Sequence, residues 1–178
     1  MTAEPQPVID LLVARHAREI DHPGGTLLAH LRRVHGLLSE WRARPAVRLA
    51  GLCHAFYGTD GFPMALGDVT RRDELTAVIG EEAEHLVYLY AACDRDFSYS
   101  RLAVDGAPYR NRFTGTESHE TAQTRRDIAE ITAANELDLA QVNEDFREAY
   151  GPALLDLFTS WRALLSDPAR ASVRTTLS

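Results

Sequence analysis

Apolar residues recur every three or four positions over most of the chain, the spacing that gathers them on one face of an α-helix. The segment that follows Thr26 is the clearest case, because Leu27, Leu31 and Val34 share one arc. Proline and glycine interrupt the pattern, as in the run Pro23-Gly24-Gly25. The pattern predicts about six to eight helices, placed at roughly residues 7–20, 26–41, 45–57, 71–79, 81–94, 118–137, 139–150 and 152–165.

Residues 97–114 have a different character. Tyr99 and Leu102 precede Asp105-Gly106, and Tyr109 follows, which is typical of a small β-hairpin. Residues 166–178 have the polarity of a frayed tail. We therefore expect an all-α fold: one domain over 1–178, with a helical-bundle core at about 7–165 and a possible hairpin around 97–114.

The net charge and the types of charged residue argue against some binding partners and some kinds of catalysis. The formal net charge is −7, whereas nucleic-acid binding needs a dense basic surface. Every basic residue is Arg, so a lysine Schiff base is excluded. No apolar run is long enough to cross a bilayer and no secretory signal opens the chain, so we expect a cytoplasmic protein with no membrane partner. Cys53 and Cys93 lie in apolar helical segments and fit no disulfide framework.

Two of the seven histidines fall on predicted core faces. His30 lies within the apolar arc of its helix, three residues after Leu27. His54 lies in a helix that is apolar nearly all round, with Gly51 one turn earlier. A buried imidazole needs a hydrogen-bond partner or a metal ion. The pattern therefore indicates one site shared by His30 and His54, or two separately satisfied core histidines.

Carboxylates at two places are candidates for a third group in such a site. Asp94 continues an apolar stripe at the C-terminal end of its helix, where it needs a compensating arginine or metal. Asp127 and Asn135 share a stripe of a later helix, where Asn135 is polar among small residues. Either carboxylate would complete a set with His30 and His54, and the alternative for Asp94 is a pair with an arginine.

Together these residues resemble the HD-domain superfamily of all-helical metalloproteins, whose members place one His on a helix, a His-Asp pair on the next central helix and an Asp on a later one. His30 resembles the first and His54 the second, and the segment 79–84 is similar to one in the stringent-response nucleotide hydrolases of that superfamily. The sequences HPGGTLL (22–28) and HxxYGT (54–59) resemble a poorly characterised HD-like family more closely. The resemblance covers roughly residues 10–140.

The resemblance implies a metal site, with departures that alter it. Ala55 stands where these proteins carry the Asp of the His-Asp pair, which disfavours phosphohydrolase activity. Two His with one carboxylate, Asp94 or Asp127, would suit Fe(II) or Zn²⁺ with open coordination positions. With Asn135 in place of the carboxylate, the alternative is no metal at all.

Three functions follow, all on a small-molecule substrate. The first is a mononuclear metalloenzyme with His30 and His54 as ligands. The second is a metal-free isomerase, cyclase or lyase in which His54 is the general acid/base and Tyr57 and Thr59 orient the substrate. The third is a non-catalytic binding module. An anionic substrate would be held by some of the candidate binding residues, which are Arg72, Arg95, Arg112 and Asn135.

Overall fold

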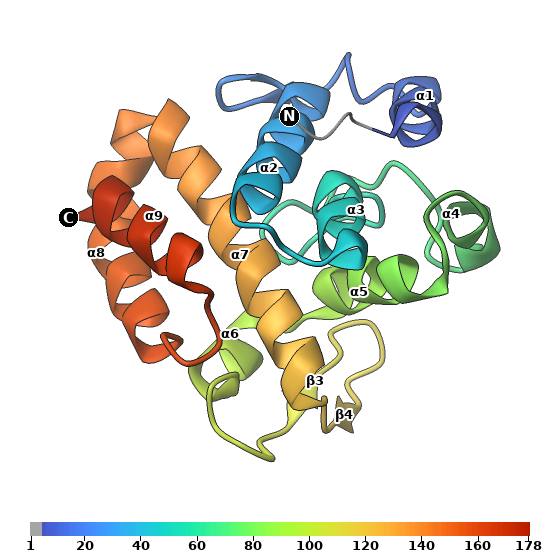
Figure 1. The fold of residues 1–178 in the computed structure, drawn as a ribbon. Helices are drawn as coiled ribbons and strands as arrows, with labels where there is room; N and C mark the ends of the chain where they lie inside the picture. The colour runs from blue at the N-terminus through green and yellow to red at the C-terminus, as the bar shows by residue number, and fades with distance from the viewer. Residues whose placement is uncertain (1–4) are drawn as a thin grey trace.

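Helices form the framework of the chain, whose computed structural model describes residues 5–178 (Figure 1). The expected all-α fold with a small hairpin is confirmed. The described part holds nine α-helices, which are α1 (Gln6–Ala14), α2 (Leu27–Glu40), α3 (Pro45–Cys53), α4 (Arg72–Ile79), α5 (Glu81–Ala92), α6 (Arg95–Ser98), α7 (Ala122–Val142), α8 (Glu144–Ser160) and α9 (Asp167–Leu177). A short 3₁₀ turn, η1 (Tyr99–Arg101), follows α6. Two antiparallel strand pairs complete it: β1 (Asp21–His22) with β2 (Gly25–Thr26), and β3 (Tyr109–Arg110) with β4 (Glu117–Ser118).

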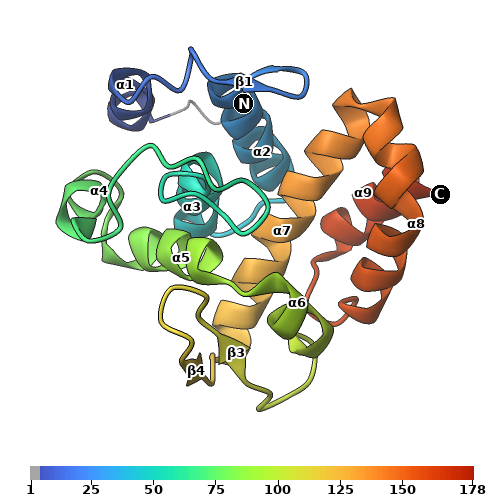
Figure 2. The same cartoon turned by 180° about the vertical axis from the view of Figure 1, so that it is seen from behind.

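The long helix α7 is the axis of the fold. It passes between the group α2, α3 and α5 on one side and the pair α8 and α9 on the other, as both opposite views show (Figures 1 and 2). Its middle is buried almost all round, including Ile128, Ile131 and Leu137. A helix covered on several faces brings the polar side chains of those faces against other elements, which is why α7 carries much of the site described below.

Local signals explain how α2 and α3 begin and end. Thr26 Oγ1 accepts a hydrogen bond from Ala29 N (3.2 Å) and caps α2, as expected. Pro45 occupies the first position of α3, where its missing N–H costs nothing. The helix ends earlier than expected, at Cys53, so His54 becomes its C-cap residue. The first helix is also shorter, because α1 ends at Ala14.

The predicted break near residue 138 is wrong. Helix α7 continues through Leu137 and Leu139 and ends at Val142, where Asn143 leaves the helical conformation. The Asn143 side chain accepts from Phe146 N (3.0 Å) and caps α8. Pro152 lies inside α8 instead of starting a helix. One long helix and one helix with an internal proline thus replace three predicted helices.

Two further expectations are corrected at the chain's end and in the segment 97–114. The hairpin lies later than expected, because Asp94 caps a helical turn at 95–98 and the strands pair as Tyr109↔Ser118 and Arg110↔Glu117. The expected tail forms α9, which is capped by Ser166 and buries Ala169 and Val173. Among the described residues no helix combines the length and apolar character that crossing a bilayer requires.

Candidate active site

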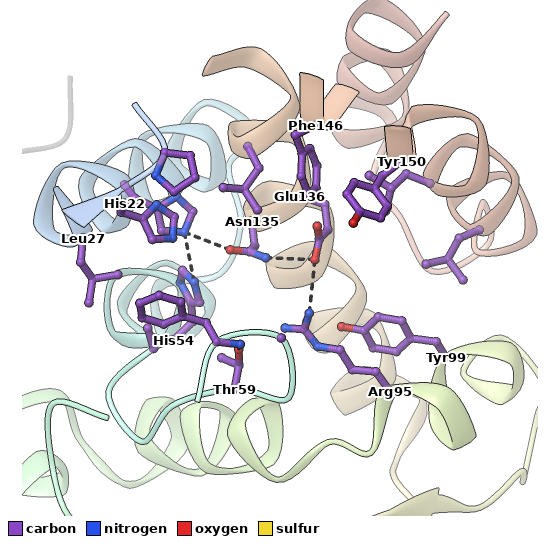
Figure 3. A pocket seen from close by; sticks show the side chains of 18 of the residues that line it. His22, Leu27, His54, Thr59, Arg95, Tyr99, Asn135, Glu136, Phe146 and Tyr150 are labelled. Carbon is purple, nitrogen blue, oxygen red and sulfur yellow. Dashed lines mark hydrogen bonds and ion pairs between the residues drawn. The ribbon is translucent and has the colours of Figure 1, made fainter. Parts of the chain in front are cut away.

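A cavity of about 640 Å³ lies beside α7, between α8 and the region where α2 and α3 meet it (Figure 3). Five of the residues singled out by the sequence line it: His30, His54, Thr59, Arg95 and Asn135. The other lining residues are mostly apolar or aromatic, and they are His22, Pro23, Leu27, Ala55, Gly61, Phe62, Tyr99, Glu136, Leu139, Phe146, Tyr150, Ala153, Leu154 and Leu157. An apolar cavity with a few convergent polar groups is the usual form of a small-molecule site.

His30 is held from behind by a buried carboxylate. Its Nδ1 lies 2.6 Å from Asp138 Oδ2. Arg33 donates to both oxygens of the same carboxylate, from Nε (2.6 Å) and Nη2 (3.0 Å). Burial alone would raise the pKa of Asp138, but the hydrogen bonds from His30 and Arg33 outweigh it and lower that pKa. Asp138 is therefore an anion, and His30 Nδ1 carries a hydrogen that it donates.

His54 faces His30 across the base of the cavity. Its Nδ1 donates to Gly51 O (2.8 Å), because a carbonyl can only accept, and its Nε2 lies 3.3 Å from His30 Nε2. Burial, followed by the nearby charge of His30, lowers the pKa of His54 to about 3. His54 is thus a neutral ring that presents a lone pair to His30.

Asn135 adds a third acceptor at the same point. Its Nδ2 donates to Glu136 Oε1 (3.1 Å), which turns Oδ1 toward His30 Nε2 at 3.0 Å. We call His30 Nε2, His54 Nε2 and Asn135 Oδ1 the acceptor cluster. With His30 neutral, the three atoms would face one another without a hydrogen between them, which is unfavourable in a buried site. One proton on His30 Nε2, or one cation at this point, satisfies all three.

His22 covers the other face of His30. The two rings stack with centroids 4.1 Å apart, and Phe62 contacts His22 edge-on. Burial, followed by the charge of His30, lowers the pKa of His22 to about 4. Among the described residues, His22 Nδ1 is buried without a hydrogen-bond partner. The turn at Gly24 and Gly25, both with positive φ, brings His22 back onto α2.

A polar path along α7 joins the acceptor cluster to a charged pair. Asn135 donates to Glu136, and Glu136 Oε1 lies 3.5 Å from Arg95 Nη1, so the dashed contacts in Figure 3 run from the histidines to Arg95. Burial raises the pKa of Glu136, against the opposing charge of Arg95.

Comparison with known proteins gives one match. A family described as a domain of unknown function, DUF6817, matches residues 11–95. This segment is just under half of the chain, and it contains His22, His30, His54 and Arg95 but ends before α7. No curated protein and no solved structure matches the chain.

Three residues expected to act on substrate have other partners. Tyr57 OH donates to Glu84 Oε1 (2.9 Å), and Arg72 binds both oxygens of Glu84 (2.8 and 2.7 Å). Arg112 Nε donates to Ala91 O (2.7 Å). None of the three is among the residues that line the cavity. Thr59 does line it, although its hydroxyl accepts from Phe62 N (2.9 Å).

The structure does not bring Asp94 or Asp127 to the histidine pair. Asp94 caps α6 by accepting from Phe97 N (3.1 Å). Asp127 accepts from Arg44 Nη2 (2.6 Å) beside a separate cavity of about 250 Å³. Within residues 5–178 no group of three or more His, Cys, Asp or Glu side chains is placed to hold a metal ion. The third atom beside the two histidines belongs to Asn135.

Sequence reasoning missed Asp138, Glu136 and Arg33. The break predicted between two helices at residue 138 removed Asp138 from any helical face, although it lies three residues after Asn135 in α7. The same continuous helix places Glu136 at the cavity. Arg33 follows His30 by three residues on α2, a spacing that puts both side chains on the same side of the helix.

Proposed function

We propose that this chain is an enzyme that acts on a small, largely apolar molecule in the cavity, with His30 as the general acid and base. The observation that carries the proposal is the position of His30, whose Nδ1 contacts Asp138 and whose Nε2 contacts His54 Nε2 and Asn135 Oδ1. The carboxylate behind the imidazole accepts from Nδ1 and fixes the orientation of the ring, so that Nε2 is the nitrogen left to give and take a proton. The sequence favoured His54 for this role.

His54 serves a different purpose in this arrangement. Its neutral ring and its hydrogen bond to Gly51 O hold a lone pair toward His30 Nε2. Asn135 Oδ1 holds a second one. Together they orient the His30 N–H and compete weakly for its proton, so that a substrate atom entering the cavity can replace one of them. In an isomerisation, His30 takes a proton from one substrate atom and returns it to another. In a cyclisation it takes the proton that is lost as the ring bond forms. In an elimination it takes a proton and returns it to the leaving group, which departs with the electron pair of the broken bond, and these are the reaction classes we propose.

A second candidate function is a mononuclear metalloenzyme, which the resemblance to HD-domain proteins also supports. Two imidazole nitrogens bound to one tetrahedral ion at about 2.0–2.1 Å lie roughly 3.3–3.4 Å apart, and the two Nε2 atoms here are 3.3 Å apart. Both Nδ1 atoms donate to outer acceptors, Asp138 and Gly51 O, as metal-bound histidines do. His30, His54 and Asn135 would hold the ion, which would polarise a substrate or activate water.

The two candidates differ in what the acceptor cluster binds. Chelator-treated protein is titrated with Zn²⁺ and with Fe(II) under anaerobic conditions, followed by calorimetry, beside His30→Gln, His54→Gln and the control His119→Gln on the exposed surface. The acid–base proposal expects no saturable site that depends on both His30 and His54. A stoichiometric site lost in both variants and kept in the control would replace it with the metalloenzyme.

A further inference from the structure

The walls of the cavity are unequal in polarity. Helix α8 contributes only apolar and aromatic side chains, with Phe146 and Tyr150 drawn near Glu136 in Figure 3. The opposite side carries the polar path from the acceptor cluster through Asn135 and Glu136 to Arg95. A ligand that fits both sides has an apolar skeleton and polar groups toward α7.

Arg95 is the one fixed positive charge among the described residues that line the cavity. Its guanidinium lies over the rings of Tyr90 and Tyr99, at 5.6 and 5.7 Å from their centroids. Gly61 lies so close that a Cβ there would be 2.7 Å from Arg95 Nη1, so glycine leaves the room that the guanidinium occupies. The side chain is thus held in place at the cavity wall.

The hydrogen bonds of Arg95 are incomplete. Its contacts are long, at 3.4 Å to Tyr90 OH and 3.5 Å to Glu136 Oε1, and its Nε is buried with no partner among the described residues. By comparison, Arg33 and Arg72 each donate two hydrogen bonds of 2.6–3.0 Å to a carboxylate. Each of the two Nη atoms carries two N–H donors, and each makes one long contact, so donors on both remain for a ligand.

We infer that Arg95 binds an oxyanion, such as a carboxylate, carried by an otherwise apolar substrate. This inference rests on the proposed function, because it names the substrate class of the same cavity. Asn135 and Glu136 lie between Arg95 and His30, so the anionic group and the reacting group are at opposite ends of the molecule. The inference concerns Arg95 and not Arg72 or Arg112, because those two arginines already donate to groups away from the cavity.

Two fluorescent probes with one skeleton test the inference. Anilinonaphthalene sulfonate carries an anionic group, and N-phenyl-naphthylamine is the same apolar skeleton without it. Arg95→Gln is expected to weaken binding of the sulfonate by roughly tenfold and to change binding of the neutral probe less than about twofold. Glu136→Gln, which removes the competing negative charge, is expected to tighten only the sulfonate. Arg18→Gln, an equal charge change on the exposed surface, is the control.

Two further variants locate the probes and guard against misfolding. Ala153→Trp should weaken both probes, because it fills the cavity from α8. Arg95→Lys keeps the charge without the planar fork and should retain part of the preference for the sulfonate if Arg95→Gln fails to fold. Equal effects on both probes in the Arg95 variants, or no effect on either, would overturn the inference. A wild-type chain that binds neither probe would overturn it too. The proposed role of His30 is tested separately, by NMR of the hydrogens on its ring nitrogens.

Discussion

The pairing of His30 with Asp138 shows what a single buried carboxylate does for the site. Asp138 accepts hydrogen bonds from His30 and from Arg33, and together these lower its pKa. Its negative charge is what keeps the hydrogen on His30 Nδ1 and leaves Nε2 as the atom that exchanges a proton. Removing the charge should therefore change both stability and the state of the ring.

We expect Asp138→Asn to lower the free energy of unfolding at pH 7 by about 1–3 kcal/mol, because it weakens hydrogen bonds to two partners. A carboxylate with a depressed pKa stabilises the fold above its ordinary pKa, and this contribution is lost as the pH falls through its value in the folded state. The gap between wild type and variant, measured by urea unfolding, should shrink from pH 7 toward pH 3. The control, Asp156→Asn, is exposed and should show no such gap.

Glu130 on α7 is expected to change the free energy of unfolding with pH in the opposite direction. Its Oε1 accepts from Ser166 N (2.5 Å), but Oε2 is buried without a partner among the described residues, and burial raises its pKa. The charged form therefore costs stability, and the cost disappears as the pH falls below the raised pKa. Glu130→Gln should stabilise the fold at pH 8 by on the order of 1 kcal/mol, with a smaller gain at pH 5. The exposed Glu148→Gln should show neither effect.

At the scale of elements, the contact between α2 and α3 sets the distance between the two histidines. Gly51 allows close approach, since a Cβ there would lie 2.2 Å from Leu38 Cδ1, and Leu38 is fully buried. Gly51 also supplies the carbonyl oxygen that accepts from His54 Nδ1 and orients that ring. The packing of one glycine thus links the helix pair to the geometry of the site.

Two glycine-to-alanine variants test that link. Gly51→Ala should destabilise the fold by about 1–3 kcal/mol, because the added methyl overpacks the helix contact. Gly36→Ala on α2 should stabilise it by roughly 0.5–1 kcal/mol, since no described atom lies within 4 Å of the new Cβ and alanine favours helix. Urea unfolding of both variants measures the difference. Similar effects for the two would show that the helices do not pack as closely as the structure has them.

The elements also show how far the sequence can be read. The apolar arc of residues 27–38 and the cap at Thr26 are local signals, and they correctly predicted α2 and the burial of His30. The break expected near residue 138 and the tail expected after residue 165 were wrong, because α7 and α9 are stabilised by packing against each other and against α8. Such tertiary support leaves little trace in local periodicity.

At the scale of the whole molecule, the cavity exists because helices distant in sequence enclose it. Periodicity predicted that His30 and His54 face the core, and the structure places their Nε2 atoms 3.3 Å apart. Periodicity could not predict that α7 would supply Asn135 and Asp138, because their contacts with His30 join residues about a hundred positions apart. It also gave no sign that Asp94 and Asp127 bind elsewhere. The resemblance to HD-domain proteins implied His30 and His54 together with Asp94 or Asp127, whereas the third side chain that the structure places beside the two histidines is Asn135.

The central claim is that His30 is the ring that carries the exchangeable proton. Nitrogen-15 NMR of the histidine rings in chelator-treated protein at pH 5.5 tests it directly, with His30→Gln and His54→Gln to assign the signals. We predict hydrogens on both ring nitrogens of His30 and on Nδ1 alone of His54, whose pKa is lowered to about 3. A His30 ring with no hydrogen on Nε2, beside a His54 ring that is doubly protonated, would contradict the account.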